Sequence, residues 1–262
     1  MALMHVDFFS DVLGIAANMD VIVPQHSKRL IGMDTAKWDG PYPTLYLLHG
    51  LSDDHTIWQR RTSIERYVAN LPLVVVMPTV QRGFYTNQKQ GYDYFTFISE
   101  ELPAICEQFF NLSDRREDRF AAGLSMGGYG AMKLGLRCPD RYAAVASLSG
   151  AMDIERRFEE GPKSFYAKEI KRTFGTKKQF LGSDDDLFAL AERLCEYDGP
   201  RPALFSCCGT EDRLLAENRD FIDAFGEKLN ITYEEGPGAH TWEFWDAWIQ
   251  RVLEWLPLEG RR

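Results

Sequence analysis

Stretches typical of buried β-strands alternate with stretches typical of helices along most of this chain. Two runs rich in β-formers open it, with Gly14 as the turn between them. Predicted strands cover 5–10, 18–24, 44–50, 71–78, 118–125, 142–150, 201–209 and 230–236. Predicted helices cover 63–70, 94–110, 126–138, 214–229 and 241–256. Such alternation favours the α/β class, with a mostly parallel sheet covered by helices on both faces.

The length of the chain is compatible with one domain. A chain of 262 residues with 45% hydrophobic residues can bury one large core. The pattern is interrupted at about 151–200, where the sequence is polar and broken. We therefore predict a single domain over 1–262 with a small helical insertion at about 151–200.

A serine flanked by glycines lies between a predicted strand and a predicted helix. The stretch Gly123-Leu124-Ser125-Met126-Gly127 matches G-x-S-x-G in the strand–turn–helix context that gives this pattern its meaning. The sharp turn exposes the hydroxyl, and the helix N-terminus favours a developing oxyanion. Ser125 is therefore a candidate nucleophile, and the alternative is a serine that only caps the helix.

A nucleophilic serine needs a base and an acid that orients the base. In this fold both partners follow the serine, the acid first. Of the five histidines only His240 follows Ser125, in a loop before the last predicted helix. Glu211 and Asp212 come directly after the strand at 201–209. Asp212 is the preferred acid, and Glu211 stays open as an alternative.

Two backbone N–H groups are candidates for an oxyanion hole. One belongs to Met126, which follows the nucleophile, and the other to Leu51, after the strand at 44–50. In the same loop, His49 is expected to brace the backbone rather than perform chemistry. Trp58 is expected either to line the site or to cap the following helix, and the sequence leaves these two roles open.

Composition excludes several other classes of function. The formal net charge of −9 argues against nucleic acid or an anionic membrane surface as a partner. The N-terminal stretch has no basic region before its apolar residues, and no uncharged apolar run is long enough for a membrane span. Five scattered cysteines fit reduced thiols. We expect a cytoplasmic protein without stable membrane association.

Several motifs in the same order resemble the tributyrin esterase group of the esterase D family. They are "LYLLHGLSDDHTIW", "GFYTN", "FISEELP", "FAAGLSMGGYGAMKLGLRCPDRYAAVASLSG", "CGTED" and "GAHTWEFWDAWI". The resemblance covers nearly the whole chain and is weakest at about 151–200. It implies an α/β-hydrolase with Ser125 as nucleophile, Asp212 as acid and His240 as base. It also implies the N–H groups of Leu51 and Met126 as the oxyanion hole.

The resemblance implies a serine carboxylesterase that hydrolyses short-chain acyl esters through an acyl-enzyme. S-formylglutathione hydrolysis and acetyl or feruloyl ester hydrolysis on carbohydrates are the alternatives. A small-molecule ester is the expected partner, a homo-oligomer is an open expectation, and no metal or other cofactor is needed. Tyr85 and Asn87 follow a central strand and are candidate substrate contacts.

The insertion carries aromatic residues and a run of acids with two interpretations each. Its aromatic side chains are expected to line an acyl site or to anchor the insertion: Phe158, Phe165, Tyr166, Phe174 and Phe180. The run Asp184-Asp185-Asp186 is expected to be a solvated helix start rather than a metal site, because no histidine accompanies it.

Overall fold

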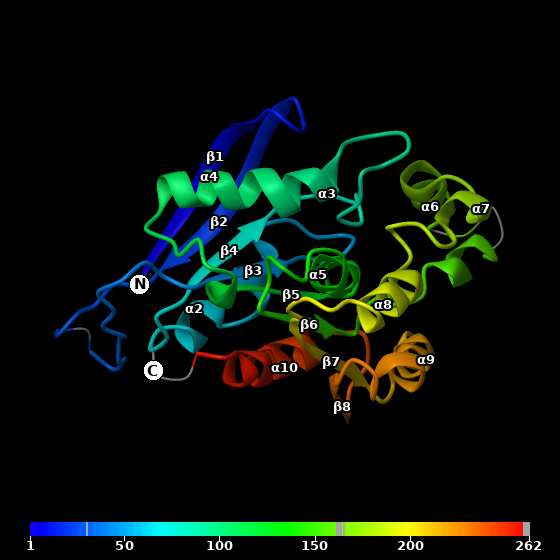
Figure 1. Ribbon diagram of the computed structural model, residues 1–262. Coiled ribbons are helices and arrows are strands. Elements are labelled where there is room, and N and C mark those ends of the chain that lie inside the picture. The colour runs from blue at the N-terminus through cyan, green and yellow to red at the C-terminus, as the bar shows by residue number, and fades with distance from the viewer. Residues whose placement is uncertain (30, 161–163, 165, 259–262) are drawn as a thin grey trace.

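An eight-stranded sheet forms the centre of the molecule (Figure 1). The computed structural model describes residues 1–29, 31–160, 164 and 166–258. The strands are β1 (Ala2–Ser10), β2 (Ile15–Val23), β3 (Thr44–Leu48), β4 (Val74–Pro78), β5 (Arg119–Leu124), β6 (Ala144–Leu148), β7 (Ala203–Gly209) and β8 (Thr232–Gly236). Their order is β1-β2-β4-β3-β5-β6-β7-β8. The pairs β1–β2 and β2–β4 are antiparallel and all others parallel, so the sheet is mostly parallel, as the sequence predicts.

Helices cover both faces of this sheet (Figure 1). One face carries α1 (Ile57–Arg61), α2 (Ile64–Tyr67) and α10 (Trp242–Trp255). The other carries α3 (Tyr94–Thr96), the π-helix η1 (Phe97–Glu101), α4 (Leu102–Phe109), α5 (Met126–Arg137), α8 (Leu187–Cys195) and α9 (Leu215–Phe225). Among the described residues, no helix is both long and apolar enough to cross a membrane.

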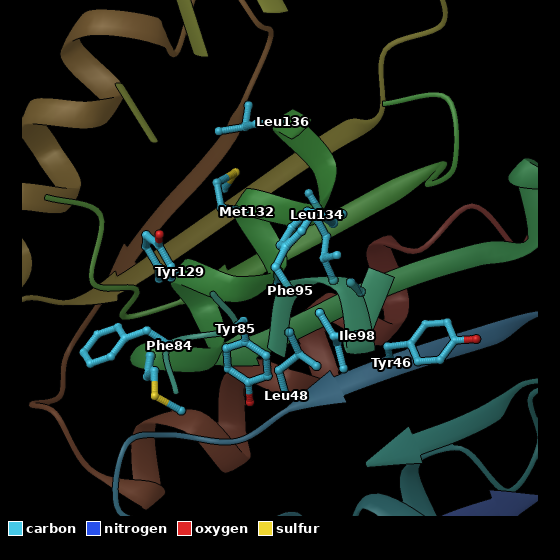
Figure 2. Close-up of a cluster of buried hydrophobic side chains, with 14 of the residues drawn as sticks. Tyr46, Leu48, Phe84, Tyr85, Phe95, Ile98, Tyr129, Met132, Leu134 and Leu136 are labelled. Carbon is cyan, nitrogen blue, oxygen red and sulfur yellow. The ribbon is translucent and has the colours of Figure 1, made fainter. Parts of the chain in front are cut away.

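The period-two alternation of strand side chains builds two hydrophobic cores. In β3, Tyr46 and Leu48 contribute to the core under α5, whereas Leu45 and Leu47 contribute to the core under α10. Figure 2 shows the first core, where Leu48 and Tyr85 lie close to one another among side chains from α5. Because both faces of β3 and β4 are buried, these strands are continuous apolar runs in the sequence.

Two predicted helices differ from the observed ones. The predicted helix at 94–110 is three consecutive helical pieces, because η1 widens the turn between α3 and α4. The predicted helix at 63–70 is one turn, α2, and the short helix α1 before it was not predicted. The short turn η2 (Arg116–Asp118) was not predicted, whereas η3 (Glu155–Phe158) lies within the predicted helical insertion.

The segment at 151–200 contains short helices, as predicted: η3, α6 (Ala167–Phe174), α7 (Lys177–Phe180) and α8. Phe174 is buried, and its ring contacts those of Phe84 and Phe180 at centroid distances of 5.5 and 5.4 Å. Phe158 packs on Phe180 at 5.5 Å. These three phenylalanines of the insertion serve as anchors, whereas Phe165 lies outside the described residues.

The acidic run before α8 is not simply solvated. Asp186 caps α8 by accepting hydrogen bonds from the N–H groups of Phe188 and Ala189. Asp185 is instead buried, and its carboxylate accepts a hydrogen bond of 2.5 Å from the ammonium of Lys133 in α5. The prediction of solvated charges was therefore wrong for Asp185. A cation buried elsewhere in the chain offsets the cost of burying this acid.

Candidate active site

Ser125 occupies a strained turn between β5 and α5. Its φ and ψ of 54° and −115° lie outside the regions that residues with a Cβ favour. The turn is held by a hydrogen bond of 2.9 Å from the Ser125 N–H to the Leu148 carbonyl. A Cβ on Gly127 would lie 2.4 Å from the Leu48 carbonyl oxygen, and one on Gly123 would lie 2.5 Å from the Gly127 backbone. Both glycines are therefore required by close backbone contact around the serine.

A hydrogen-bonded relay joins Ser125 to His240 and Asp212. The Nε2 atom of His240 lies 3.0 Å from Ser125 Oγ, and its Nδ1 atom lies 2.8 and 3.1 Å from the two carboxylate oxygens of Asp212. The three residues come from the ends of β5, β7 and β8, which meet at one edge of the sheet. The arrangement can transfer a proton from the hydroxyl to the imidazole, with the carboxylate fixing the ring.

The environment of Asp212 favours its ionised form. Burial alone would raise the pKa of Asp212, but the hydrogen bond and charge of His240 and the Leu214 N–H hold it below its ordinary value. A hydrogen bond of 2.8 Å from the Leu214 N–H also fixes the carboxylate. Asp212 is thus a buried anion that can stabilise an imidazolium.

Glu211, the alternative acid, occupies a different position. Its carboxylate accepts a hydrogen bond from the Gly238 N–H, and its own N–H donates to the Gly238 carbonyl at 3.0 Å. A Cβ on Gly209 would lie 2.1 Å from that same carbonyl oxygen. Glu211 therefore ties together the loops that carry Asp212 and His240, and it does not contact the imidazole in the described contacts.

Leu51 and Met126, the two predicted oxyanion-hole donors, lie next to Ser125 in the wall of one cavity. Both residues line the cavity that contains Ser125. Met126 is the first residue of α5, so its N–H has no partner within the helix. Among the backbone hydrogen bonds of the described residues, neither N–H donates to another group. The geometry is therefore compatible with an oxyanion hole.

His49 holds the backbone of the oxyanion loop in place. Its Nε2 accepts a hydrogen bond of 3.0 Å from the Val80 N–H, and its Nδ1 lies 2.6 Å from the Gly50 carbonyl oxygen. The tautomer with the proton on Nδ1 satisfies both contacts. Complete burial lowers the pKa of His49 to about 4, so the ring is neutral near pH 7. The Tyr85 hydroxyl donates to the His49 carbonyl at 2.9 Å and braces the same loop.

We expect His49→Ala to lower kcat about 10- to 100-fold, because the loop loses both contacts and the Leu51 N–H is no longer fixed. KM should change less, since the cavity walls stay in place. Steady-state kinetics on a neutral ester, at matched folded fraction by circular dichroism, would measure the loss. Because the native ring is neutral above about pH 5, the loss should be constant between pH 6 and 9, and a pH-dependent loss would contradict this bracing role.

A cavity of about 1060 Å³ opens over Ser125 and His240. Its walls come from the loop after β3, from α10, from the insertion and from the loop after β7. Gly50, Leu51, Ser52, Asp53, Arg61, Phe84, Leu124, Ser125, Met126, Ala151, Arg157, Glu160, Tyr166, Arg213, Leu214, His240, Thr241, Trp242, Glu243 and Trp245 line it. Trp245 packs edge-to-face against the His240 ring at 4.9 Å and fixes its plane. The cavity is large enough to enclose a small ester.

Three predicted substrate contacts do not line this cavity. Trp58 is buried and donates to the Leu48 carbonyl at 3.1 Å, and its ring supports Trp242 edge-to-face at 5.3 Å. Tyr85 is buried against α5 with its hydroxyl on the oxyanion loop. Asn87 exchanges hydrogen bonds of 2.8 and 2.9 Å with Thr96. Tertiary contacts hold all three side chains away from the cavity. These side chains therefore support the loops of the site rather than contact a ligand.

Several cavity residues were not predicted. Arg213, Trp242 and Trp245 follow the predicted acid and base within a few positions. Their closeness in sequence to Asp212 and His240 could have predicted that they line the cavity. The sequence around Arg157 and Glu160 contains no motif that predicts the same for those two residues. Within the described ranges, no group of three or more His, Cys, Asp or Glu side chains is arranged to hold a metal ion.

The model of the esterase family matches residues 34–256, most of the chain. An acetyl esterase from Caldicellulosiruptor saccharolyticus is 30% identical over 268 residues, covering 98% of both chains. The chain belongs to the esterase family. As a member of it, this esterase is a serine hydrolase that acts on carboxylic esters.

Solved structures from Staphylococcus aureus are similar to this esterase over nearly its whole length. The fluorophosphonate-binding serine hydrolase FphF has a TM-score of 0.85 at 33% identity, with 97% of this chain and 98% of that chain covered. The S-formylglutathione hydrolase FrmB has a TM-score of 0.83 at 34% identity, with the same coverage. Together with the strand order, these similarities identify the fold as an α/β-hydrolase.

Proposed function

We propose that this esterase hydrolyses short-chain acyl esters through an acyl-enzyme on Ser125. His240 is the general base and Asp212 its orienting acid, and the N–H groups of Leu51 and Met126 form the oxyanion hole. One observation carries the proposal: the Asp212–His240–Ser125 relay, with contacts of 2.8 and 3.0 Å, opens directly into the cavity.

In the first step, Ser125 Oγ attacks the ester carbonyl carbon while His240 Nε2 takes the hydroxyl proton. The carbonyl oxygen becomes an oxyanion that accepts hydrogen bonds from Leu51 and Met126, and each such donor contributes roughly 3 to 4 kcal/mol. Asp212 stabilises the imidazolium without taking its proton. The tetrahedral intermediate then collapses, and His240 returns the proton to the departing alcohol.

In the second step, water hydrolyses the acyl-enzyme. His240 takes a proton from the water as its oxygen attacks the acyl carbon, and the same two N–H groups stabilise the second oxyanion. Collapse breaks the bond to Ser125 Oγ, which recovers its proton from His240. The products are the carboxylic acid and the regenerated enzyme, so the cycle balances with one water consumed.

The preferred acyl length is tested with 4-nitrophenyl esters from acetate to decanoate. We expect the highest kcat/KM among the short acyl chains, in keeping with the similarity to the acetyl esterase from Caldicellulosiruptor saccharolyticus. A fluorophosphonate should abolish turnover and label Ser125, as read by mass spectrometry of the labelled peptide. A maximum at decanoate would contradict the short-chain proposal, and no turnover or label would contradict the esterase mechanism at this site.

S-formylglutathione hydrolysis is the second candidate function, favoured by the 34% identity to FrmB. Acetyl and feruloyl esters of carbohydrates are a further alternative, since a ferulic acid esterase structure has a TM-score of 0.76 at 25% identity. Parallel kcat/KM values on S-formylglutathione, acetylated xylo-oligosaccharides and methyl ferulate separate these activities. The S-formylglutathione assignment requires a kcat/KM at least tenfold above that on 4-nitrophenyl acetate.

We also propose that the protein works in the cytoplasm and forms a homo-oligomer. The five cysteines are unpaired, which supports a reducing compartment. Exposed apolar side chains on the edge strand β1, Leu3, Met4 and Phe9, support self-association. Cell fractionation tests the compartment, and sedimentation velocity of the purified protein tests the oligomer.

A further inference from the structure

Charged side chains divide between two walls of the cavity. Asp53, Arg61 and Glu243 belong to the loop after β3, to α1 and to α10. Arg157, Glu160 and Arg213 belong to the insertion and to the loop that leads into α9. The second group forms what we call the insertion wall, made of Arg157, Glu160, Tyr166 and Arg213. An esterase acting only on small neutral esters does not need three arginines around its site.

Two contacts join the segments of the insertion wall. The Arg157 guanidinium donates to the buried carboxylate of Glu217 in α9 at 2.6 Å, and its Nε lies 3.9 Å from Glu160. The Arg213 guanidinium donates to the Tyr166 hydroxyl at 3.1 Å. Both contacts run between the insertion and the start of α9, so the two arginines have fixed places on the same wall.

The two arginines differ in how their charge is compensated. Arg157 has two carboxylates beside it, Glu217 and Glu160. Arg213 has a neutral hydroxyl as its hydrogen-bond partner, and in the part of the chain that the structure describes no carboxylate forms an ion pair with it. A guanidinium presents five donors in a planar fork, so Arg213 keeps donors available for a ligand.

The acids of the cavity are engaged elsewhere. Glu160 accepts a hydrogen bond from the Ser164 hydroxyl and lies beside Arg157. Glu243 lies in the first turn of α10. Its carboxylate accepts hydrogen bonds from Thr241 and from its own backbone, and these lower its pKa. Burial raises the pKa of Asp53, although the Gly50 N–H and Ser52 lower it in part. Each acid has a partner within its own segment. Among the described residues of the insertion wall, Arg213 is the charged side chain without an oppositely charged partner.

Arg213 is next to the residue that orients the base. Asp212 contacts His240, and Leu214 after it lines the cavity. Arg213 therefore follows directly on the acid of the relay, and its side chain lines the same cavity as Ser125. An anion there would meet the guanidinium in a charge-assisted hydrogen bond, which is stronger than a bond between neutral groups.

From these contacts we propose that Arg213, with the Tyr166 hydroxyl, forms an anion subsite that selects esters carrying a carboxylate several atoms from the scissile carbonyl. The proposal rests on the proposed ester hydrolysis and adds a class of substrate to it. The carboxylate belongs either to the acyl group or to the alcohol, and the experiment distinguishes these two sources.

The test compares matched pairs of esters that differ in one charge. For the alcohol side the pair is 4-acetoxybenzoate and the neutral 4-acetoxybenzamide, and for the acyl side it is the 4-nitrophenyl monoester of adipic acid and 4-nitrophenyl hexanoate. We expect the anionic member of one pair to have a kcat/KM about tenfold above its neutral partner, mainly through KM. The preference should shrink as ionic strength rises, because salt screens the guanidinium.

Substitutions assign the preference to Arg213. Arg213→Gln should lower the ratio of anionic to neutral kcat/KM to about one, Arg213→Lys should keep part of the preference, and Glu160→Gln should increase it. Arg219→Gln is the matched control, because Arg219 lies on α9 outside the cavity and pairs with Glu235 at 2.6 Å. A wild type without preference in either pair would overturn the proposal. An Arg213→Gln variant that slows both members equally would also overturn it.

A binding measurement separates this proposal from the proposed hydrolysis. Calorimetry on the Ser125→Ala variant measures the Kd of each intact ester without turnover. We expect the anionic ester to bind about tenfold more tightly than its neutral partner, and the added Arg213→Gln change to abolish the difference. Equal Kd values would overturn the anion subsite even if hydrolysis is normal. Unequal Kd values would support it even if the wild type hydrolysed no ester.

Discussion

Ser125→Ala should lower kcat by about 10⁴-fold or more while leaving the protein folded. The loss is large because Ser125 Oγ is the hydroxyl that lies within hydrogen-bond distance of His240 Nε2, at 3.0 Å. His240 and Asp212 keep their contact, but the base has no hydroxyl to activate. Steady-state kinetics with 4-nitrophenyl acetate and burst-phase measurements of acyl-enzyme formation would record the change.

Stability should respond little to the same substitution. The hydroxyl of Ser125 has one described partner, the imidazole at 3.0 Å, so its removal should change the free energy of unfolding by less than about 1 kcal/mol. Ser99→Ala is a matched control, because Ser99 is a buried serine in η1 whose hydroxyl bonds the Phe95 carbonyl. A variant at Ser125 as active as the control would refute the nucleophile assignment.

Local patterns were enough to predict the three residues of the relay, Ser125, His240 and Asp212, that the structure brings together. The glycines flanking the serine reflect backbone contacts within a few residues and with β3, and such contacts leave a signature in the sequence. The acid and then the base were sought after Ser125, at the ends of later strands, because the G-x-S-x-G pattern implies that chain order. The alternation of apolar runs likewise predicted the sheet, because both faces of its central strands are buried.

Side-chain direction in loops was not predictable in the same way. Tyr85 and Asn87 come after a central strand, at the correct end of the sheet, yet packing turns them into the protein. Asp185 was misjudged for a similar reason. Its partner Lys133 lies 52 residues earlier in the chain. No local sequence pattern predicts that the segment between them folds back to bring the two side chains together. Contacts between distant segments decide such cases.

The contact between Lys133 and Asp185 leads to the largest expected effect on stability. The Lys133 ammonium is fully buried in α5 and donates to Asp185 at 2.5 Å and to the Thr86 hydroxyl at 2.8 Å. Burial lowers the pKa of Lys133 to about 8 although Asp185 opposes this shift. Lys133→Met would leave the Asp185 carboxylate buried without a cation, and we expect the free energy of unfolding to fall by about 3 to 5 kcal/mol.

Replacing both partners should cost much less than replacing one. In Lys133→Met/Asp185→Leu no unpaired charge is buried, so most of the lost stability should return. Urea unfolding at pH 7, followed by circular dichroism, would compare the wild type, the single variant and the double variant. A single variant within about 1 kcal/mol of the wild type, or a double variant less stable than the single one, would show that the pair does not anchor the insertion.

The same pair should affect substrate binding, because α5 begins directly after Ser125 and the insertion forms one wall of the cavity. Loss of this anchor should raise KM for esters in the single variant and leave KM unchanged in the double variant.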